Sequence, residues 1–251
     1  MIKMITCLRI NLDIKEEMKF NVNKASLFHG YLMEQVNEKF AEEMHISKLR
    51  PYSLYLTKEN GQWYWVVNTL NKYGYENIIE ILSLKKEIEL KHGDLKIKIK
   101  DKNVRYTSFD EIFKNNYFKD NISHYISIEF ITPTAFKSDG KYINYPTTKL
   151  LFSSLINKYD TSSTTTNIYD EQLIKELLNN VEISKYNLRS SYFHLEGIKI
   201  PAFLGKIEIK ISGNKNLVSF ANMLFNFGEY SGVGIKNAIG MGGIKILEKY
   251  F

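Results

Sequence analysis

Histidines are the residues of this chain best suited to proton transfer, because the imidazole titrates near neutral pH and can give or take a proton within one turnover. His45 is the strongest of the five candidates. Lys48 and Arg50 follow it closely, and such cations could stabilise the charge that develops on a phosphate under attack. We therefore expect a general acid or base at His45, acting on a phosphate ester.

His29 is a second candidate, and its use depends on how the chain folds before His45. Along one uninterrupted helix the two rings would lie about 24 Å apart, on nearly opposite faces. Asn37 is a competent N-cap, and a helix break there could bring His29 or Tyr31 toward His45. A packing role for His29 on the flank of the helix remains equally open.

A glycine-rich stretch near the end of the sequence, residues 228–243, reads GEYSGVGIKNAIGMGG and holds six of the 14 glycines. Glycine at this density indicates positive φ angles or close approach of another backbone. Lys236, Tyr230 and Ser231 interrupt the cluster. They add a cation, hydroxyl groups and a ring, so amides and Lys236 could hold the phosphates of an anionic polymer. A turn that only lets a helix pack on a strand is the alternative.

Nucleotide-binding motifs do not fit this stretch. It contains G-x-G at 232–234. A Walker motif, however, needs Gly-Lys-Ser/Thr before a helix, and a dinucleotide site needs a strand, the glycines and then a helix. Here we expect a helix before the glycines and a short strand after them. A P-loop or Rossmann site is therefore not predicted.

Composition favours a globular protein with an anionic partner. The chain has 251 residues, of which 44% are apolar and 25% charged, close to globular averages. This length allows two domains. A formal charge of +6 favours nucleic acid, and less strongly an acidic membrane surface. A lysine-rich, solvated surface explains the charge equally well.

The lone Cys7 excludes an intramolecular disulfide and a cysteine-based zinc site. The alternating start, MIKMITCLRINLDIK, lacks the apolar run of a signal peptide, and no apolar stretch has the length of a membrane helix. We expect a cytoplasmic protein without membrane attachment, metal or cofactor.

Two similar series of elements position these residues. In the first half, apolar periodicity and turn residues predict a strand at 2–12 and a long helix at 24–44. A hairpin around Glu59-Asn60-Gly61 follows, with strands at 52–56 and 63–67, and then a short helix at 77–84 and a second hairpin with strands at 86–91 and 95–100. This βαββαβ order matches the ferredoxin-like unit. Residues 101–121 lack a clear period, so we place a domain boundary there, giving 1–118 and 119–251.

The second half repeats the order. Strands are predicted at 123–132, 181–194, 198–212 and 244–251, and helices at 146–159, 170–180 and 217–227, with a loop at 161–166. We therefore predict an α+β fold of two tandem ferredoxin-like, or RRM-like, domains. The active site is expected in the cleft between them, with the glycine stretch holding the ligand.

This arrangement resembles the CRISPR-associated repeat-processing endoribonucleases of the RAMP superfamily, in particular those that accompany type III interference complexes. The resemblance rests on FHGYLMEQ (28–35), MH (44–45), TPTAFKSDGKYINYP (132–146), LLFSSLINKYD (150–160), IPAFLGKIEIKISG (200–213) and FGEYSGVGIKNAIGMGGIK (227–245). It covers most of the chain. The glycine loop alone indicates only the superfamily, which includes non-cleaving subunits.

The resemblance implies binding of CRISPR repeat RNA and metal-independent cleavage of precursor crRNA, leaving a 2′,3′-cyclic phosphate and a 5′-hydroxyl. It implies His45 as the catalytic histidine, assisted by His29 or Tyr31, with Lys48 or Arg50 as the cationic stabiliser. Further RNA contacts are expected at Lys137, Lys141, Lys149 and Arg189, and in the glycine loop at Tyr230, Ser231, Gly232, Gly234, Lys236, Gly240 and Gly242.

Two other functions compete with this one. A non-catalytic RNA-binding subunit of the same superfamily would use His45 only structurally. An RRM-type binder of single-stranded RNA is less favoured, because no strand carries the expected run of glycine and aromatic residues. Either a monomer or a homodimer is compatible with the sequence. The three remaining histidines, His92, His124 and His194, are expected to be structural or surface residues.

Overall fold

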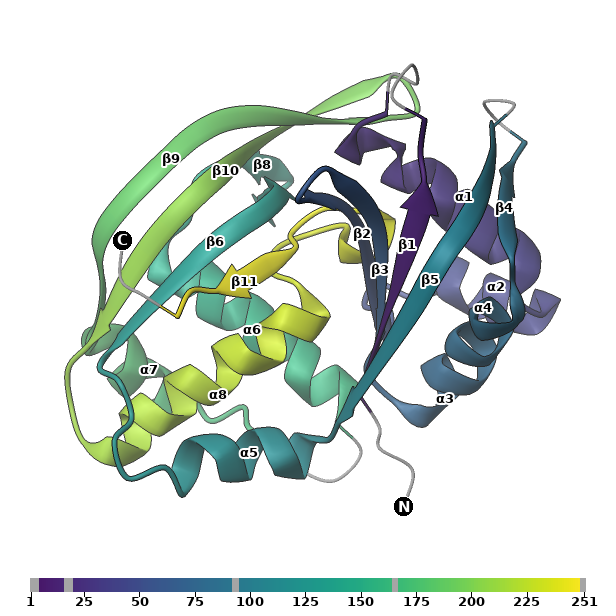
Figure 1. Cartoon of the computed structure of the whole chain (residues 1–251). Helices are drawn as coiled ribbons and strands as arrows, with labels where there is room; N and C mark the ends of the chain where they lie inside the picture. Colours follow the sequence, from purple (N-terminus) through teal and green to yellow (C-terminus); the bar gives the residue numbers. More distant parts are fainter. Residues whose placement is uncertain (1–4, 16–19, 92–94, 164–166, 249–251) are drawn as a thin grey trace.

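The computed structural model describes residues 5–15, 20–91, 95–163 and 167–248. Two antiparallel sheets lie next to each other, each with helices on one face (Figure 1). The two sheets and their helices form an α+β fold of two ferredoxin-like units, as predicted. His92 falls outside the described residues.

The first unit has a sheet of order β2-β3-β1-β5-β4. Its strands are β1 (Ile5–Asp13), β2 (Tyr52–Glu59), β3 (Gln62–Thr69), β4 (Glu87–Leu90) and β5 (Leu95–Thr107). The last strand, β5, returns to lie beside β1, as a split βαβ unit requires. The short strand β4 adds a fifth strand at the edge.

Helices cover one face of this sheet. They are η1 (Val22–Lys24), α1 (Ala25–Gln35), α2 (Glu38–Ile46), α3 (Lys72–Gly74), η2 (Tyr75–Ile79) and α4 (Glu80–Leu84). Every second residue of β1, namely Leu8, Ile10 and Leu12, points into the core beneath them. Fully buried Phe28 and Trp65 fill its centre, with ring centroids 5.0 Å apart.

The single helix predicted at 24–44 is wrong, since the chain forms α1 and α2 with a break between them. Val36 and Asn37 adopt extended backbone, and the Asn37 side chain accepts a hydrogen bond from the Phe40 amide at 2.7 Å. Asn37 is therefore the N-cap of α2, as its residue type allows. The break lets α2 change direction while Phe40 and Met44 stay buried.

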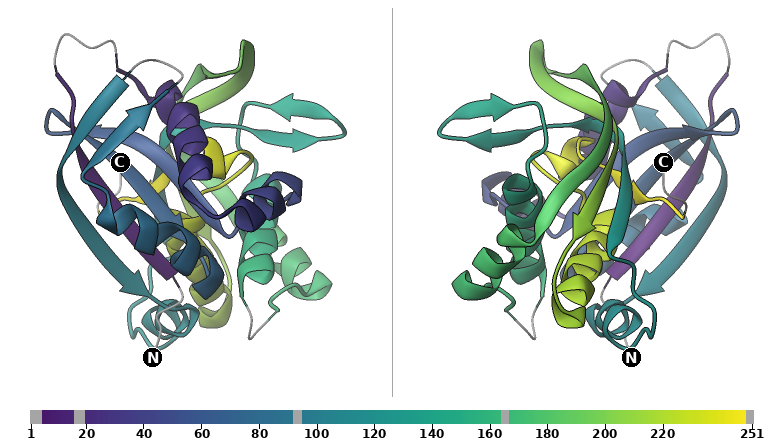
Figure 2. Two further views of the ribbon diagram at one scale, coloured as in Figure 1. Left: turned by 90° about the vertical axis from the view of Figure 1, so that its right-hand side faces the viewer. Right: turned by 90° about the vertical axis from the view of Figure 1, so that its left-hand side faces the viewer.

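The second unit has a sheet of order β11-β6-β10-β9. Its strands are β6 (Tyr125–Thr134), β9 (Val181–Leu195), β10 (Ile198–Ile211) and β11 (Ile244–Ile246), and its helices are α6 (Thr148–Ser162), α7 (Glu171–Asn179), α8 (Lys215–Ser231) and η3 (Asn237–Ile239). A separate hairpin of β7 (Phe136–Ser138) and β8 (Lys141–Ile143) projects from the body (Figure 2).

Two further details differ from the sequence prediction. The stretch that lacked a period contains the end of β5 and a helix, α5 (Phe109–Tyr117), which Ser108 caps by accepting from the Glu111 amide. Phe109 and Ile112 of α5 belong to the second core. The domain boundary at 118 stays a prediction. The glycine stretch, in turn, begins inside α8, which ends at Ser231.

The face of the first sheet opposite its helices packs against the end of α8. Ser53 Oγ of β2 donates to the Tyr230 carbonyl at 2.5 Å, and Asn68 Nδ2 of β3 donates to Ser53 Oγ at 3.0 Å. Glu229, next to Tyr230, is half-buried, and its partial burial raises the pKa of its carboxyl group. The hydrogen bond between Ser53 and Tyr230 joins the two units at the end of α8, where the glycine loop begins.

Candidate active site

The segment between α2 and β2 brings His29 into a polar cluster. Arg50 Nε donates to the Met44 carbonyl at 2.7 Å, and Arg50 Nη1 lies 3.3 Å from His29 Nε2. On the other side of the ring, His29 Nδ1 lies 3.5 Å from the Tyr52 hydroxyl. One arginine therefore connects the first helix to the end of the second.

The partners of His29 determine its tautomer. A guanidinium can only donate, so Nε2 must accept and Nδ1 carries the proton. Burial, and secondarily the charge of Arg50, lower the pKa of His29 to about 4. The ring is therefore neutral at pH 7, and its one lone pair is already engaged by Arg50. In this arrangement His29 holds Arg50, and is not a free base.

His45 lies in the last turn of α2 and is exposed. Its ring makes no hydrogen bond or ion pair with any residue in the described part of the chain, which leaves both nitrogens open to a ligand. It follows Met44, whose carbonyl accepts from Arg50. Ser47, two residues after His45, lines a cleft that also contains Arg50 and Tyr52, but His45 itself does not line it.

Tyr31 does not join this cluster. It lies two residues beyond His29 and hence on nearly the opposite side of α1. Its ring packs at 6.3 Å from Trp65, and its hydroxyl donates to the Glu87 carbonyl at 3.4 Å. Burial raises the pKa of Tyr31. The geometry therefore sets His29, and not Tyr31, beside Arg50.

Close packing accounts for several glycines of the loop. A Cβ at Gly234 would lie 2.2 Å from the Ala135 oxygen, and one at Gly242 only 2.0 Å from the Val233 oxygen. A Cβ at Gly240 would lie 2.3 Å from the Cβ of Ala25 in the first unit. Gly232, the C-cap of α8, also has positive φ, 66°. These residues let the loop pack against both units.

Most amides of the loop are already bonded within the protein. Those of Val233 and Ile235 donate to Gly242 O and Ala135 O, and that of Gly234 donates to Ser154 Oγ. Those of Gly242 and Gly243 donate to Pro133 O and Thr132 Oγ1. In the described part of the chain, the amides at the start of η3, beginning at Lys236, have no such partner, and Lys236 has a left-handed backbone with φ 56°.

A cleft of about 310 Å³ separates the two units at this point. It is lined by Ser47, Lys48, Leu49, Arg50, Tyr52 and Leu70 from the first unit and by Lys158, Ser231, Gly234, Ile235, Lys236, Asn237, Ala238 and Ile239 from the second. Four of these described lining side chains are cations, and none of them is a carboxylate. It is therefore suited to an anion.

The cleft combines only part of the predicted site. It brings Lys48 and Arg50 together with Ser231, Gly234 and Lys236, and His29 borders it through Arg50 and Tyr52. His45, Tyr230, Gly232, Gly240 and Gly242 do not line it. Tyr230 instead packs against the second core.

The other predicted RNA contacts lie away from the cleft on exposed surface. Lys137 and Lys141 are on the projecting β7–β8 hairpin, where Lys137 Nζ sits 5.7 Å from the centre of the Tyr142 ring. Lys149 is in the first turn of α6, and Arg189 is on β9.

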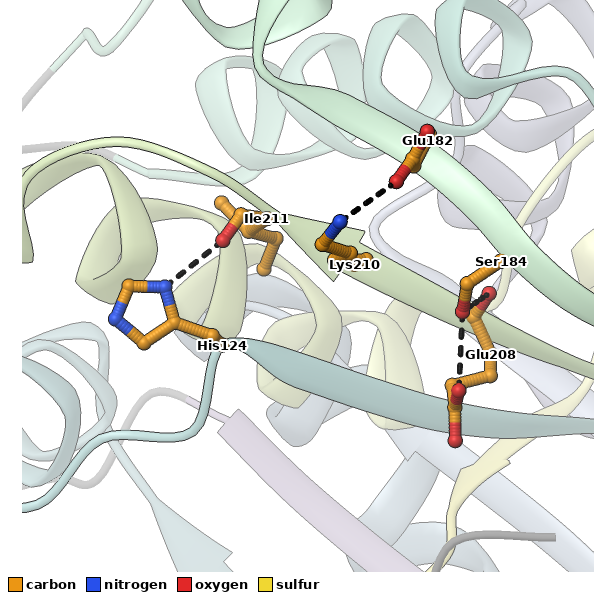
Figure 3. A network of polar contacts seen from close by, with 6 residues as sticks. All are labelled: His124, Glu182, Ser184, Glu208, Lys210 and Ile211. Carbon is orange, nitrogen blue, oxygen red and sulfur yellow. Dashed lines mark hydrogen bonds and ion pairs between the residues drawn. The ribbon is translucent and has the colours of Figure 1, made fainter.

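The remaining described histidines have structural positions. His124 precedes β6, and its Nδ1 donates to the Ile211 carbonyl at 2.8 Å (Figure 3). The same view shows Lys210 bonded to Glu182 and Ser184 bonded to Glu208 along β9 and β10. The His194 amide donates to Asn23 Oδ1 at 3.1 Å.

Sequence reasoning missed three residues of the site. Tyr52 was assigned only to a strand, and burial raises its pKa to about 12. Asn237 holds the loop closed by donating to the Val233 and Met241 carbonyls. Lys158 is buried at the cleft, and its one sequence signal is its position on the apolar stripe of α6 after Leu151 and Leu155.

Within residues 5–15, 20–91, 95–163 and 167–248, no group of three or more His, Cys, Asp or Glu side chains is placed to hold a metal ion. No helix in the described part of the chain is long and apolar enough to span a membrane.

The sequence is similar to known proteins of one family. A family model described as CRISPR-associated endoribonuclease Cas6 matches residues 128–244. A CRISPR-associated endoribonuclease Cas6 of Streptococcus thermophilus is 36% identical over 225 residues, covering 88% of this chain and 90% of the relative. One from Mycobacterium tuberculosis is 27% identical over 87% of this chain and 70% of its own length.

Solved structures share the fold. A Thermus thermophilus Cas6 in a product complex superposes with a TM-score of 0.79 at 20% identity, covering 98% of this chain and 100% of that one. The product of a Cas6-related gene from Pyrococcus furiosus superposes with a TM-score of 0.63 at 14% identity, covering 98% of this chain and 100% of that one.

Proposed function

We propose, from the premise that this chain belongs to the CRISPR-associated endoribonuclease Cas6 family, that it binds CRISPR repeat RNA in the cleft between its two units and cleaves precursor crRNA there. The observation that carries this proposal is the lining of the cleft. Lys48, Arg50, Lys158 and Lys236 border it without any lining carboxylate. A site of this composition attracts a phosphate backbone.

The proposed reaction is attack by a 2′-hydroxyl of the RNA on the adjacent phosphate. The nucleophile belongs to the substrate, so the protein has only to position the strand, move protons and stabilise charge. His45 is exposed, and its ring has no partner among the described residues. It acts as the general base that takes the proton of the 2′-hydroxyl, or as the general acid that gives a proton to the leaving 5′-oxygen. Arg50 and Lys48 stabilise the charged phosphate oxygens. The products are a 2′,3′-cyclic phosphate and a 5′-hydroxyl, with no metal needed in any step.

His29 acts as a positioning residue in this scheme. Neutral and bonded to Arg50 at 3.3 Å, it fixes the direction of the guanidinium without adding a competing charge. Tyr31, which bonds at the β4 edge, has no part in proton transfer. The glycine loop contributes Lys236 and its shape, and Lys137, Lys141, Lys149 and Arg189 contact more distant nucleotides.

The biological setting is part of the same proposal. We expect the protein to act in the cytoplasm, as a monomer or homodimer, and to supply guide RNAs to a type III interference complex. The free, buried Cys7 is compatible with a reducing compartment.

Cleavage of a matched pair of RNAs tests the function. The protein is incubated in chelator with its CRISPR repeat RNA, either all-ribose or with one 2′-deoxy substitution before the scissile phosphate. Cleavage of the all-ribose strand alone is expected. Tight binding without cleavage of either strand would instead identify a non-catalytic RNA-binding subunit.

His45→Ala tests the assignment of the catalytic residue. The rate should fall by about 10²–10⁴ while the Kd changes only a few fold, because proton transfer is lost and the cationic cleft is kept. His124→Ala is the matched control and should cleave at the wild-type rate, since the His124 side chain donates to the Ile211 carbonyl and does not line the cleft. Full activity of His45→Ala would remove His45 from the mechanism.

A further inference from the structure

Lys158 is a lysine in a position that normally holds an apolar residue. It follows Leu151 and Leu155 on the buried stripe of α6, and the residue is only 7% exposed. Its Nζ donates to the Gly232 carbonyl at 2.9 Å, where α8 ends. An ammonium group has three donors, so this bond leaves two of them without a partner in the described part of the chain.

The charge of Lys158 is uncompensated as well. No carboxylate in the described part of the chain forms an ion pair with it. Burial lowers the pKa of its ammonium group to about 7, and no nearby charge offsets that effect. A buried, unpaired cation is unfavourable, and an apolar side chain of the same length would usually serve the fold at least as well. Packing alone does not account for a lysine here.

The position of Lys158 in the cleft supplies a reason for the charge. It lines the cleft together with Lys48 and Arg50 from the first unit and Lys236 from the glycine loop. Lys48 and Arg50 lie on one wall, and Lys158 comes from the opposite unit. An anion in the cleft would be the missing counterion and would accept the two remaining donors.

We propose that Lys158 binds a backbone phosphate of the RNA at the floor of the cleft, opposite Arg50, and that this phosphate is its counterion. The inference rests on the proposed function, which makes RNA the ligand of the cleft. It adds a binding residue from the second unit on an element, α6, outside the glycine loop.

A proton linkage follows from this assignment. In the free protein Lys158 is only partly protonated near pH 7, and a bound phosphate favours the charged form. RNA binding should therefore take up protons at Lys158 above pH 7. The other titratable groups that line the cleft are Lys48, Arg50, Lys236 and Tyr52, and His45 acts on the same RNA in the proposed reaction. All five are kept in the Lys158 variants, so the comparison with wild type isolates Lys158.

The test measures the Kd of the uncleavable 2′-deoxy repeat RNA at pH 6.0 and pH 8.5, at one ionic strength. Loss of the Lys158 charge should make wild type bind about tenfold more weakly at pH 8.5 than at pH 6.0, since the pKa of Lys158 in the RNA-free protein lies about 1.5 below pH 8.5. Lys158→Met should bind about tenfold more weakly than wild type at pH 6.0 and should lack this part of the pH dependence. Lys175→Met, on the exposed face of α7, is the matched control and should follow wild type.

Lys158→Gln separates the charge from the hydrogen bond. Its amide can still donate to the Gly232 carbonyl, so a purely structural role predicts wild-type binding, whereas a phosphate contact predicts the behaviour of Lys158→Met. Thermal unfolding of both variants should stay at or above the wild-type Tm. Unfolding of both variants, or wild-type Kd values at both pH values, would overturn the assignment of Lys158. Failure of wild type itself to bind the RNA would instead overturn the proposed function.

Discussion

Replacing His29 with Gln should remove a loss of stability that the wild-type protein shows as the pH falls below 7. Burial and the neighbouring Arg50 hold the pKa of His29 at about 4 in the folded protein, against an ordinary value of 6.5. Below pH 6.5 the unfolded chain therefore binds a proton that the folded protein resists. The resulting stability is present above pH 6.5 and is lost as the pH falls toward 4.

The size of the effect follows from the two pKa values. Their difference corresponds to about 3 kcal/mol when fully developed, at about 1.36 kcal/mol for each pKa unit. At pH 5 the His29 ring is nearly fully protonated in the unfolded chain while it stays mostly neutral in the folded protein, so about 2 kcal/mol of stability should be lost between pH 7 and pH 5. Partial exposure of the ring to solvent reduces this, and we expect about 1–2 kcal/mol.

Urea unfolding at pH 5 and pH 7 gives the change in the free energy of unfolding between the two pH values. The effect of His29 is the difference in this change between wild type and His29→Gln. The wild type should lose about 1–2 kcal/mol more than His29→Gln between the two pH values, because all other groups titrate alike in both proteins. Arg50→Met should show an intermediate loss, since burial is the larger cause of the lowered pKa and remains in that variant. Equal losses in wild type and His29→Gln would refute the buried, neutral His29 and with it the tautomer assigned above.

Three further variants test the break in the first helical region and the glycine loop. Asn37→Ala removes the N-cap of α2, so it should lower the free energy of unfolding by about 0.5–2 kcal/mol and slow single-turnover cleavage. An unchanged cleavage rate would show that the N-cap does not position the catalytic residues. Gly240→Ala should cost about 1–3 kcal/mol in urea unfolding, because its Cβ would lie 2.3 Å from that of Ala25 at a φ of 118°. Gly30→Ala, with open space around it, should instead stabilise α1 by about 0.5–1 kcal/mol, and equal effects of the two substitutions would contradict the packing role of Gly240. Lys236→Ala should weaken RNA binding and reduce the slope of log K against log salt by about one; an unchanged slope would make the loop structural only.

Local patterns in the sequence were sufficient for much of the fold. Strand alternation and turn residues such as Asn60-Gly61 depend on neighbouring residues, and the hairpin is found there with positive φ at both positions. Asn37 likewise acts on the amide three residues on, so a helix break could be anticipated from residue type. The missed helix α5 shows the limit, because its apolar residues pack mainly on the distant α8.

The sequence by itself determined the candidate residues, the two repeated units and the family resemblance, because these depend on residue type and order along the chain. Only the tertiary structure decided which candidates meet. The bond between His29 and Arg50 spans 21 positions, and that between Lys158 and Gly232 spans 74. Contacts of this kind are fixed by how the helices and strands of each unit pack on one another. Neither the neutral state of His29 nor the uncompensated charge of Lys158 could therefore be predicted from local pattern.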